Sequence, residues 1–345
     1  MDKIILKERI NKFDNIKGLA IILIVVGHLL ITNDFSLKLL KNFLFIIHLP
    51  LFFFVSGYFS KIGPGELLKS FKRIMIPYII FCILFKIYFY IPYFQLSYYP
   101  IFIYPEYGLW FLLSIFTMKM ILPLFNKLKY PISFSIILAM IIGFININPG
   151  LLAITKTICY MPIFLMGFTY KKHEEIIKNK YSANKNNIKK LINSDKFMAI
   201  ILILIMAICV MIAYTYQLEF IKFNKAYSFN GIDPLFDIIK RAFLIIVQLV
   251  FVLLVNRLMT NEKTILTKIG INSMAIYLLH LPFKRIFLFI MKRISITNPL
   301  FSLIIALITS ALLVYILSRD PISKYLNKIF ELAYNLFFNP IISRL

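Results

Sequence analysis

The chain is poor in acidic residues and has no extended polar region. It contains 15 Asp and Glu against 39 Lys and Arg, which gives a formal net charge of +24 over 345 residues. The longest polar segment runs only over residues 171–196, the length of a loop. The sequence therefore excludes a separate soluble domain, and we predict one integral membrane domain over residues 1–345.

Cysteine is also scarce. The three cysteines, Cys82, Cys159 and Cys209, all fall within apolar runs and at unrelated spacings. This arrangement matches no metal-binding pattern and argues against a framework of disulfides. We accordingly expect no metal site.

Long apolar runs are what the chain has in abundance. Hydrophobic residues make up 60% of the sequence and the mean hydropathy is +0.83, whereas soluble domains are nearer half apolar. The runs are long enough to cross a bilayer. They predict an all-α polytopic membrane bundle of about ten transmembrane helices, at residues 16–33, 42–60, 74–94, 107–125, 132–148, 151–170, 197–216, 237–256, 271–291 and 300–318.

The positive charge is concentrated in alternate loops. Lysines crowd the N-terminal arm and the loops after the second and sixth runs, whereas residues 92–107 and 146–150 contain no Lys or Arg. This pattern follows the positive-inside rule, so it indicates a multi-pass protein of the cell membrane with both termini cytoplasmic, and not a nucleic-acid-binding protein. The basic arm before the first run resembles a signal peptide, but no small-residue cleavage site follows it, so we predict a retained helix.

His28 lies near the outer end of the first apolar run. On a straight helix it shares a face with Asp14 and Lys17, but Asp14 lies about 21 Å away along the axis and cannot orient the imidazole. Ionisable groups inside a bilayer are costly and are usually functional. We interpret His28 as a general base in a membrane cavity; a histidine bonded between two helices is the structural alternative.

His48 enters the membrane from the outer side in the second run, just before Pro50. The first two runs are joined by a short loop and should pack as a hairpin, which brings His28 and His48 to comparable depths. Two histidines at one level favour function over the alternative, in which His48 and Pro50 only shape the start of the helix.

Lys69, Lys72 and Arg73 form a basic mouth before the third run. Lys and Arg are the usual partners of phosphate, so these side chains could hold the phosphates of a nucleotide-bearing donor. Ordinary positive-inside charge is the simpler explanation of these residues.

Two further stretches carry polar groups near the membrane. Glu106 precedes Trp110, the only tryptophan, which could anchor the protein at the interface or stack on a sugar ring. Tyr277 and His280 share one face of a later helix, and Arg241 lies at the outer start of another. Such groups need partners or a wet cavity.

The ordered set of these stretches resembles acyltransferase family three of integral membrane proteins, in particular its fucose 4-O-acetylase-like and polysaccharide O-acetyltransferase subgroup. The family's opening pattern corresponds to Arg9, Asp14, Lys17-Gly18 and Gly27-His28, and its later motifs to residues 48–57, 109–112 and 277–280. The chain departs from the family at Lys17, where Arg is frequent, and at Ser70, where the basic loop often has a first arginine.

This resemblance implies transfer of an acyl group, with acetyl the expected one, from cytoplasmic acyl-coenzyme A to a hydroxyl of a cell-surface or lipid-linked carbohydrate. His28 would be the general base, with His48 or His280 orienting it or polarising the thioester. The implied residues are catalytic His28, His48 and Asp14; donor-binding Lys69, Lys72, Arg73, Arg9 and Lys17; and acceptor-binding Trp110, Glu106, Tyr277, His280 and Arg241.

Two other classes of function fit the composition. A polytopic transporter or flippase for a lipid-linked sugar or an ion-coupled solute would also use intramembrane His, Lys and Arg. A membrane scaffold or sensor would tolerate substitution of His28. The transporter predicts no acyl transfer by the purified protein.

Overall fold

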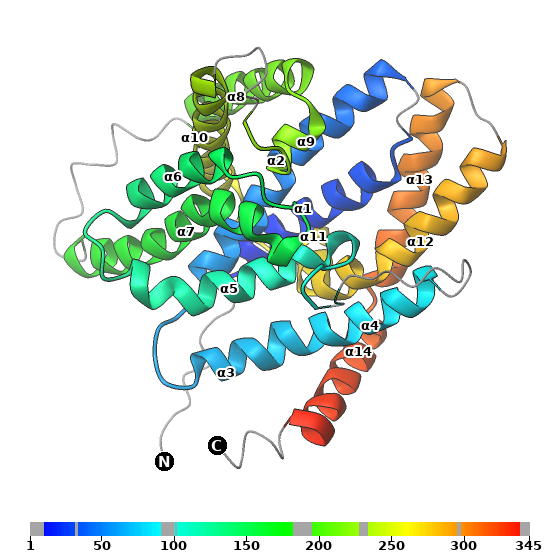
Figure 1. Cartoon of the computed structure of the whole chain (residues 1–345), viewed down its shortest axis with the longest axis horizontal. Helices are drawn as coiled ribbons and strands as arrows, with labels where there is room; N and C mark the ends of the chain where they lie inside the picture. Colours follow the sequence, from blue (N-terminus) through cyan, green and yellow to red (C-terminus); the bar gives the residue numbers. More distant parts are fainter. Residues whose placement is uncertain are drawn as a thin grey trace.

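The computed structural model describes residues 10–31, 34–90, 100, 102–181, 195–227, 234–294 and 298–338. Every regular element in this part of the chain is helical, and it contains no strand. Figure 1 shows the helices packed side by side around α1 and α2. The predicted all-α class is confirmed.

Seven helices of the described residues are long and apolar enough to cross a membrane, which confirms a polytopic membrane protein. They are α2 (Phe35–Tyr58), α5 (Trp110–Phe125) with the turn before it, α7 (Ile154–Tyr181), α8 (Asp195–Thr215), α10 (Pro234–Leu258), α12 (Ser273–Ile294) and α13 (Pro299–Leu317).

The other three predicted spans fall on shorter or more charged helices. These are α1 (Asn11–Leu29), which carries Lys12, Asp14 and Lys17 in its first two turns, α4 (Ile76–Tyr90) and α6 (Pro131–Ile141). The described part of each predicted apolar run thus falls on a helix, and residues 32–33 and 91–94 of two runs lie outside the described residues. The number of helices that cross the bilayer and the side of the termini stay predictions.

Helix α2 occupies the centre of the bundle, where it packs against α1, α7, α8 and α10. Its residues from Leu44 to Val55 are buried without a break. A helix that is apolar on every side is enclosed by its neighbours instead of presenting one face to solvent. This central position fixes His48, which lies within that buried stretch.

A short helix that the hydropathy pattern did not predict, α11 (Ile265–Ile271), lies along the first half of α1. Asn15 of α1 donates its amide to the carbonyls of Thr260 and Glu262, at 3.0 Å each, and accepts from the hydroxyl of Thr267 at 2.6 Å. The backbones can approach because Gly18 faces the carbonyl of Leu266. The first half of α1 is therefore held against α11 and the segment before it by these hydrogen bonds.

Several short elements complete the chain. Helix α14 (Asp320–Ala333) follows the last apolar span and buries Leu326 and Phe330 against the bundle, and Figure 1 shows it extending away below α4. The remaining elements are α3 (Glu66–Ser70), the π-helix η1 (Phe71–Met75), α9 (Leu218–Ile221), the π-helix η6 (Tyr334–Phe338) and the 3-10 turns η3 (Tyr107–Leu109), η4 (Ile142–Phe144) and η5 (Leu151–Ala153).

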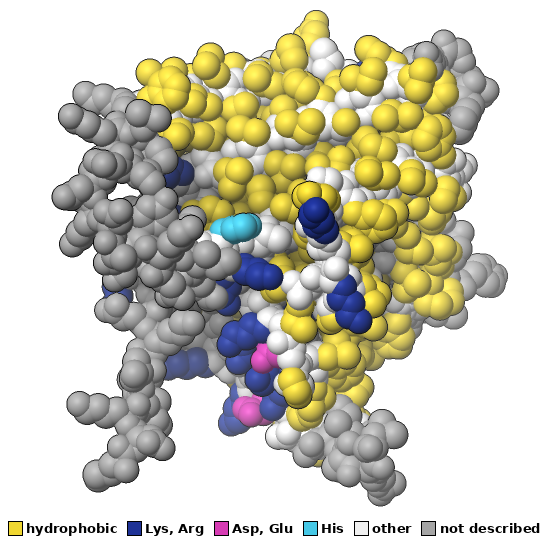
Figure 2. Space-filling view, turned by 90° about the vertical axis from the view of Figure 1, so that its left-hand side faces the viewer, with side chains coloured by type: hydrophobic (Ala, Val, Ile, Leu, Met, Phe, Trp, Pro, Cys, Tyr) yellow, Lys and Arg dark blue, Asp and Glu magenta, His cyan; other side chains and the backbone are white. Residues whose placement is uncertain are grey.

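The surface is divided by side-chain type. Figure 2 shows apolar side chains over the upper and right-hand parts of one face, while Lys and Arg gather below its centre beside the few acidic groups. Large hydrophobic residues are exposed along the outside of α8 and α13, among them Ile203 and Leu312. Apolar surface on this scale suits contact with lipid.

Candidate active site

We call the end of the bundle where α1 ends and α2 begins the outer end, and the end where α2 ends and α3 begins the inner end. The charge pattern predicts that the outer end faces the outside and the inner end the cytoplasm. Three of the four histidines come together around one cavity: His28 in the last turn of α1, His48 in α2 and His280 in α12.

His28 and His280 form a hydrogen-bonded pair. Nδ1 of His28 and Nε2 of His280 are 2.8 Å apart, and the two rings are stacked with an interplanar angle of 11°. Nδ1 of His280 lies 3.0 Å from the carbonyl oxygen of Ile276. A carbonyl oxygen only accepts, so His280 donates from Nδ1 and its Nε2 is the acceptor.

This arrangement fixes the tautomer of His28. Its Nδ1–H donates to His280, which leaves Nε2 of His28 with its lone pair available. His280 is fully buried, whereas His28 is half-buried and lines a cavity. The pair therefore leaves Nε2 as the basic nitrogen of a residue that lines the cavity, and a second imidazole holds the ring, as an orienting group holds a catalytic histidine.

His48 is close but is not the partner of His28. Its Nδ1–H donates to the carbonyl of Leu44 at 2.5 Å, and the ring of Phe45 lies 4.9 Å from it and 5.8 Å from the ring of His28. No hydrogen bond joins His28 to His48 in the described residues. Of the two orienting candidates left open by the sequence, the geometry supports His280, while His48 lines the same cavity as His28.

The outer cavity has a volume of about 260 Å³ and is lined from α1, α2, α5, α7, α12 and the segment after α9. Trp110 forms part of its wall, with Nζ of Lys156 4.8 Å from the centre of the indole. Tyr277 also lines it, and its hydroxyl donates to the carbonyl of Gly108. Trp110 thus lines the same cavity as His28, and its roles as membrane anchor and as sugar-stacking residue both stay predictions.

Four lysines that the sequence argument did not single out also line this cavity: Lys41, Lys156, Lys222 and Lys284. Lys222 lies 3.4 Å from the carboxylate of Glu219. Burial opposes the ionisation of Glu219, but a 2.6 Å hydrogen bond from Asn224 and the charge of Lys222 keep its pKa below the usual value. The sequence does carry one indication of these lysines: they lie at the predicted outer end, where the positive-inside rule leads us to expect few cations.

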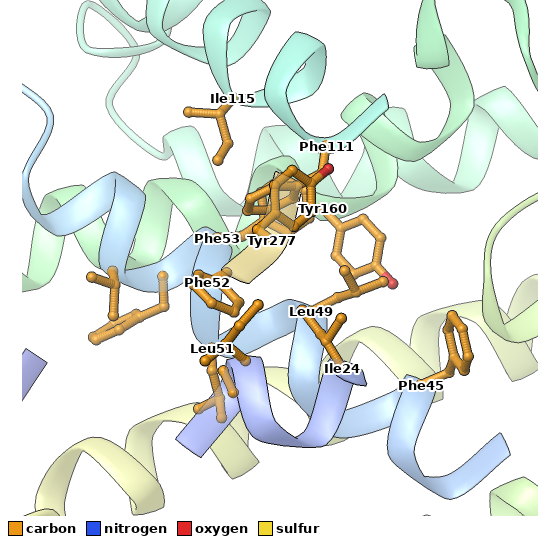
Figure 3. Packing of buried hydrophobic residues seen from close by; sticks show 14 of the residues in the cluster. Ile24, Phe45, Leu49, Leu51, Phe52, Phe53, Phe111, Ile115, Tyr160 and Tyr277 are labelled. Atoms are coloured by element: carbon orange, nitrogen blue, oxygen red, sulfur yellow. The ribbon is translucent and has the colours of Figure 1, made fainter. Parts of the chain in front are cut away.

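A second cavity, of about 330 Å³, lies on the inner side of the first. Its wall is mainly apolar, but Lys17 of α1 and Lys119 of α5 both line it, and Nζ of Lys119 donates to the hydroxyl of Ser60 at 2.9 Å. Phe111 and Tyr277 line both cavities. Figure 3 shows these two rings together, beside Phe53 and Tyr160. They form the partition between the inner and outer cavities.

The basic loop residues lie outside the inner cavity. Lys69 pairs with Glu66 at 2.8 Å, and Lys72 lies 3.8 Å from Glu331 and 4.6 Å from the centre of the Tyr334 ring. Arg73 is exposed, next to the cavity residue Ile74. The loop cations are thus near the inner cavity without entering it.

Asp14 is buried at the inner end of α1, where it pairs with Lys17 at 2.8 Å. The pair lies at the opposite end of α1 from His28, as the rise of the helix requires. Its place beside the inner cavity suits a role at the cytoplasmic entrance of that cavity. A direct catalytic role for Asp14 has no geometric support. Arg9, its expected companion, lies outside the described residues.

Arg241 and Glu106 do not line the outer cavity. Arg241 is 2% exposed, donates to the carbonyl of Lys225 at 2.8 Å and lies 4.5 Å from the centre of the Tyr227 ring. It therefore anchors the segment before α10. Glu106 is half-buried just before η3 and leads into the cavity residue Tyr107. The geometry gives the acceptor assignment of either residue no support.

The fold and the site define a multi-pass membrane protein in which a histidine pair lies beside a partition between two cavities. The family model described as an acyltransferase domain, that of acyltransferase family three, matches residues 10–319, and the chain belongs to this family. It is a membrane acyltransferase. Comparison with curated proteins gave no match, and neither did comparison with solved structures.

Proposed function

We propose that the protein is an O-acyltransferase of the cell membrane that moves an acetyl group from cytoplasmic acetyl-coenzyme A to a hydroxyl of a carbohydrate. The observation that supports this is the His28–His280 pair, which leaves Nε2 as an acceptor on His28, a residue that lines the outer cavity. A lone-pair nitrogen held at a fixed orientation is what a general base needs.

The transfer step uses this nitrogen twice. The proton of the carbohydrate hydroxyl moves to Nε2 of His28 while the hydroxyl oxygen attacks the carbonyl carbon of the thioester. The carbon–sulfur bond then breaks, and the departing thiolate takes the proton back from His28. The products are the acetyl ester and free coenzyme A, and His280 stabilises the transient imidazolium through its acceptor nitrogen.

The donor would approach from the inner end. Lys17 and Lys119 line the inner cavity and Arg73 lies just outside it, so a polyanionic head can remain near the cytoplasmic surface. The uncharged pantetheine arm suits the apolar walls of the cavity. It would bring the thioester to the partition formed by Phe111 and Tyr277, next to the outer cavity.

The acceptor would occupy the outer cavity. Trp110 offers an aromatic face close to His28, and aromatic faces are suited to the apolar faces of sugar rings. The acceptor would be a surface polysaccharide or a lipid-linked glycan, as the subgroup resemblance implies.

A transfer assay with purified protein tests this function. The protein in lipid nanodiscs is given acetyl-coenzyme A labelled in the acetyl group together with a panel of glycosides, and ester formation is followed by mass spectrometry. We expect transfer by the wild type and a loss of about 100-fold to 10 000-fold in His28→Ala, the usual contribution of a general base.

The matched control is His173→Ala, because His173 is an exposed histidine near the inner end of α7. It should keep wild-type activity. Uptake of a glycoside into sealed vesicles without ester formation would instead identify a transporter, and full activity of His28→Ala would exclude His28 as the base.

A further inference from the structure

The outer cavity contains more positive charge than the proposed transfer needs. Its four lysines come from separate parts of the chain: Lys41 from α2, Lys156 from α7, Lys222 from the segment after α9 and Lys284 from α12. All four are half-buried, so they do not simply extend into the outer solvent. These four side chains are brought together only by the tertiary fold, whereas a run of basic residues in one loop would be close together in any fold.

Little of this charge is neutralised by the protein. The described residues that line the cavity include no Asp or Glu. Lys222 pairs with Glu219, and Lys156 lies over the ring of Trp110. Lys41 and Lys284 have no carboxylate partner within the part of the chain that the structure describes. The cavity therefore has a net positive charge next to His28.

Such an arrangement is costly without a ligand. Like charges repel strongly in a region of low dielectric, and half-buried cations without counter-ions lose part of their hydration. The lysines also lie at the end of the bundle where cations are normally depleted. A bound anion would offset both costs, because it would supply the missing counter-charge at the centre of the cluster.

The donor does not account for these lysines. Its phosphates belong to the end that we predict to be cytoplasmic, where Lys17, Lys119 and Arg73 lie around the inner cavity. The outer lysines lie beyond the partition of Phe111 and Tyr277. The remaining substrate is the acceptor.

We propose that the acceptor is an anionic carbohydrate, whose phosphate or carboxylate group binds between Lys41 and Lys284 while a neighbouring hydroxyl faces His28. This inference rests on the proposed function and names the class of its second substrate. Phosphate and carboxylate offer the same chemistry to an ammonium group, namely charge-assisted hydrogen bonds to anionic oxygens.

Binding can be measured apart from transfer, because Trp110 is the only tryptophan and forms part of the cavity wall. The fluorescence of His28→Ala in nanodiscs is titrated with three methyl glycosides: a neutral hexoside, the corresponding hexuronoside and the hexoside 6-phosphate. We expect at least one anionic glycoside to bind about tenfold more tightly than the neutral one, as a charged hydrogen bond allows. The uronate and phosphate arms show which anion is preferred.

Substitution of Lys41 and Lys284 tests whether these two lysines cause the preference for an anionic glycoside. In a Lys41→Gln and Lys284→Gln double variant, the neutral and anionic glycosides should bind equally, and the KM for acetyl-coenzyme A in the otherwise wild-type protein should not change. The Lys41→Arg and Lys284→Arg pair keeps the charge and should keep the preference. Lys38→Gln is the matched control, because Lys38 is exposed one turn before Lys41 on α2.

The outcomes separate the two proposals. Equal binding and equal acetylation of neutral and anionic glycosides by the wild type would overturn the anionic acceptor and leave the transferase intact. A higher KM for acetyl-coenzyme A in the double Gln variant, with the acceptor preference retained, would assign the lysines to the donor and also overturn it. Anion binding without transfer to any glycoside would overturn the proposed transferase and retain the anion site.

Discussion

The inner and outer cavities have a common wall but differ in their chemistry. The outer cavity contains His28, His48 and four lysines, whereas the inner cavity has mainly apolar walls and only two cations, Lys17 and Lys119. Phe111 and Tyr277 line both. The same bundle thus contains one cavity rich in polar and charged groups and a second cavity with mainly apolar walls.

This difference suggests how one membrane domain could serve two dissimilar substrates. In the proposed transfer, a long thioester arm loses little by leaving water for apolar walls, while a hydroxyl must meet a base and polar neighbours to react. The partition keeps the compartments distinct, and His28 lies on its polar side. Variants that change one compartment should therefore affect one substrate or one step.

The largest expected effect in this comparison is at His280, which lines neither cavity but holds His28 of the outer one. His280→Ala removes the acceptor that holds Nδ1–H of His28, so the ring can rotate and take the other tautomer. We expect kcat to fall about 100-fold, the scale of losing a group that orients a catalytic base, with the KM for acetyl-coenzyme A unchanged. Steady-state kinetics in nanodiscs measure both.

The conservative variant His280→Gln keeps an acceptor oxygen and should recover part of the lost kcat. His48→Ala should have a smaller effect than His280→Ala, because His48 bonds to the Leu44 carbonyl and not to His28. If His48→Ala proved the more damaging, the orienting role would belong to His48 and the assignment of the pair would be wrong.

The helices could be predicted from the sequence, because hydropathy is a local property. Each of the ten predicted apolar runs falls on a helix, and the all-helical membrane fold is confirmed. Helix α11 could not be predicted from hydropathy, because a helix of seven residues, Ile265–Ile271, is too short to form an apolar run of spanning length. It is stabilised by long-range hydrogen bonds to Asn15 instead.

The site could be predicted only in part, because its contacts are distant along the chain. The cost of an intramembrane imidazole pointed to His28, but its partner His280 lies 252 residues away, and helical periodicity gives no information on that pairing. The lysines of the outer cavity were missed for the same reason. Each is a single cation in its own stretch of sequence, and only packing shows that they converge.

A smaller effect is expected in the inner compartment at Lys119 of α5, which lines the inner cavity together with Lys17 of α1. Lys119→Met removes a cation from an otherwise apolar cavity, so the KM for acetyl-coenzyme A should rise about tenfold if a charged hydrogen bond to the donor is lost. Acceptor binding, followed by Trp110 fluorescence, should not change. The exposed Lys127→Met, two turns further along the chain, is the control.

A rise in the acceptor Kd of Lys119→Met, with the donor KM unchanged, would reverse the two assignments. Equal changes in both constants would mean that the partition does not separate the substrates.

The smallest expected effect concerns stability and compares the two ends of α1. A methyl group at Gly18 would meet the backbone carbonyl of Leu266 in α11, which cannot move without shifting the helix, whereas one at Gly27 would lie 3.6 Å from the side chain of Leu44. Gly18→Ala should therefore lower the free energy of unfolding by about 1–3 kcal/mol, the usual cost of overpacking. Gly27→Ala should be neutral or stabilising, since alanine favours a helix by up to about 1 kcal/mol over glycine. Thermal unfolding in one detergent ranks the two variants, and a lower melting temperature for Gly27→Ala would place the tightly packed end of α1 beside His28 instead of beside Asp14.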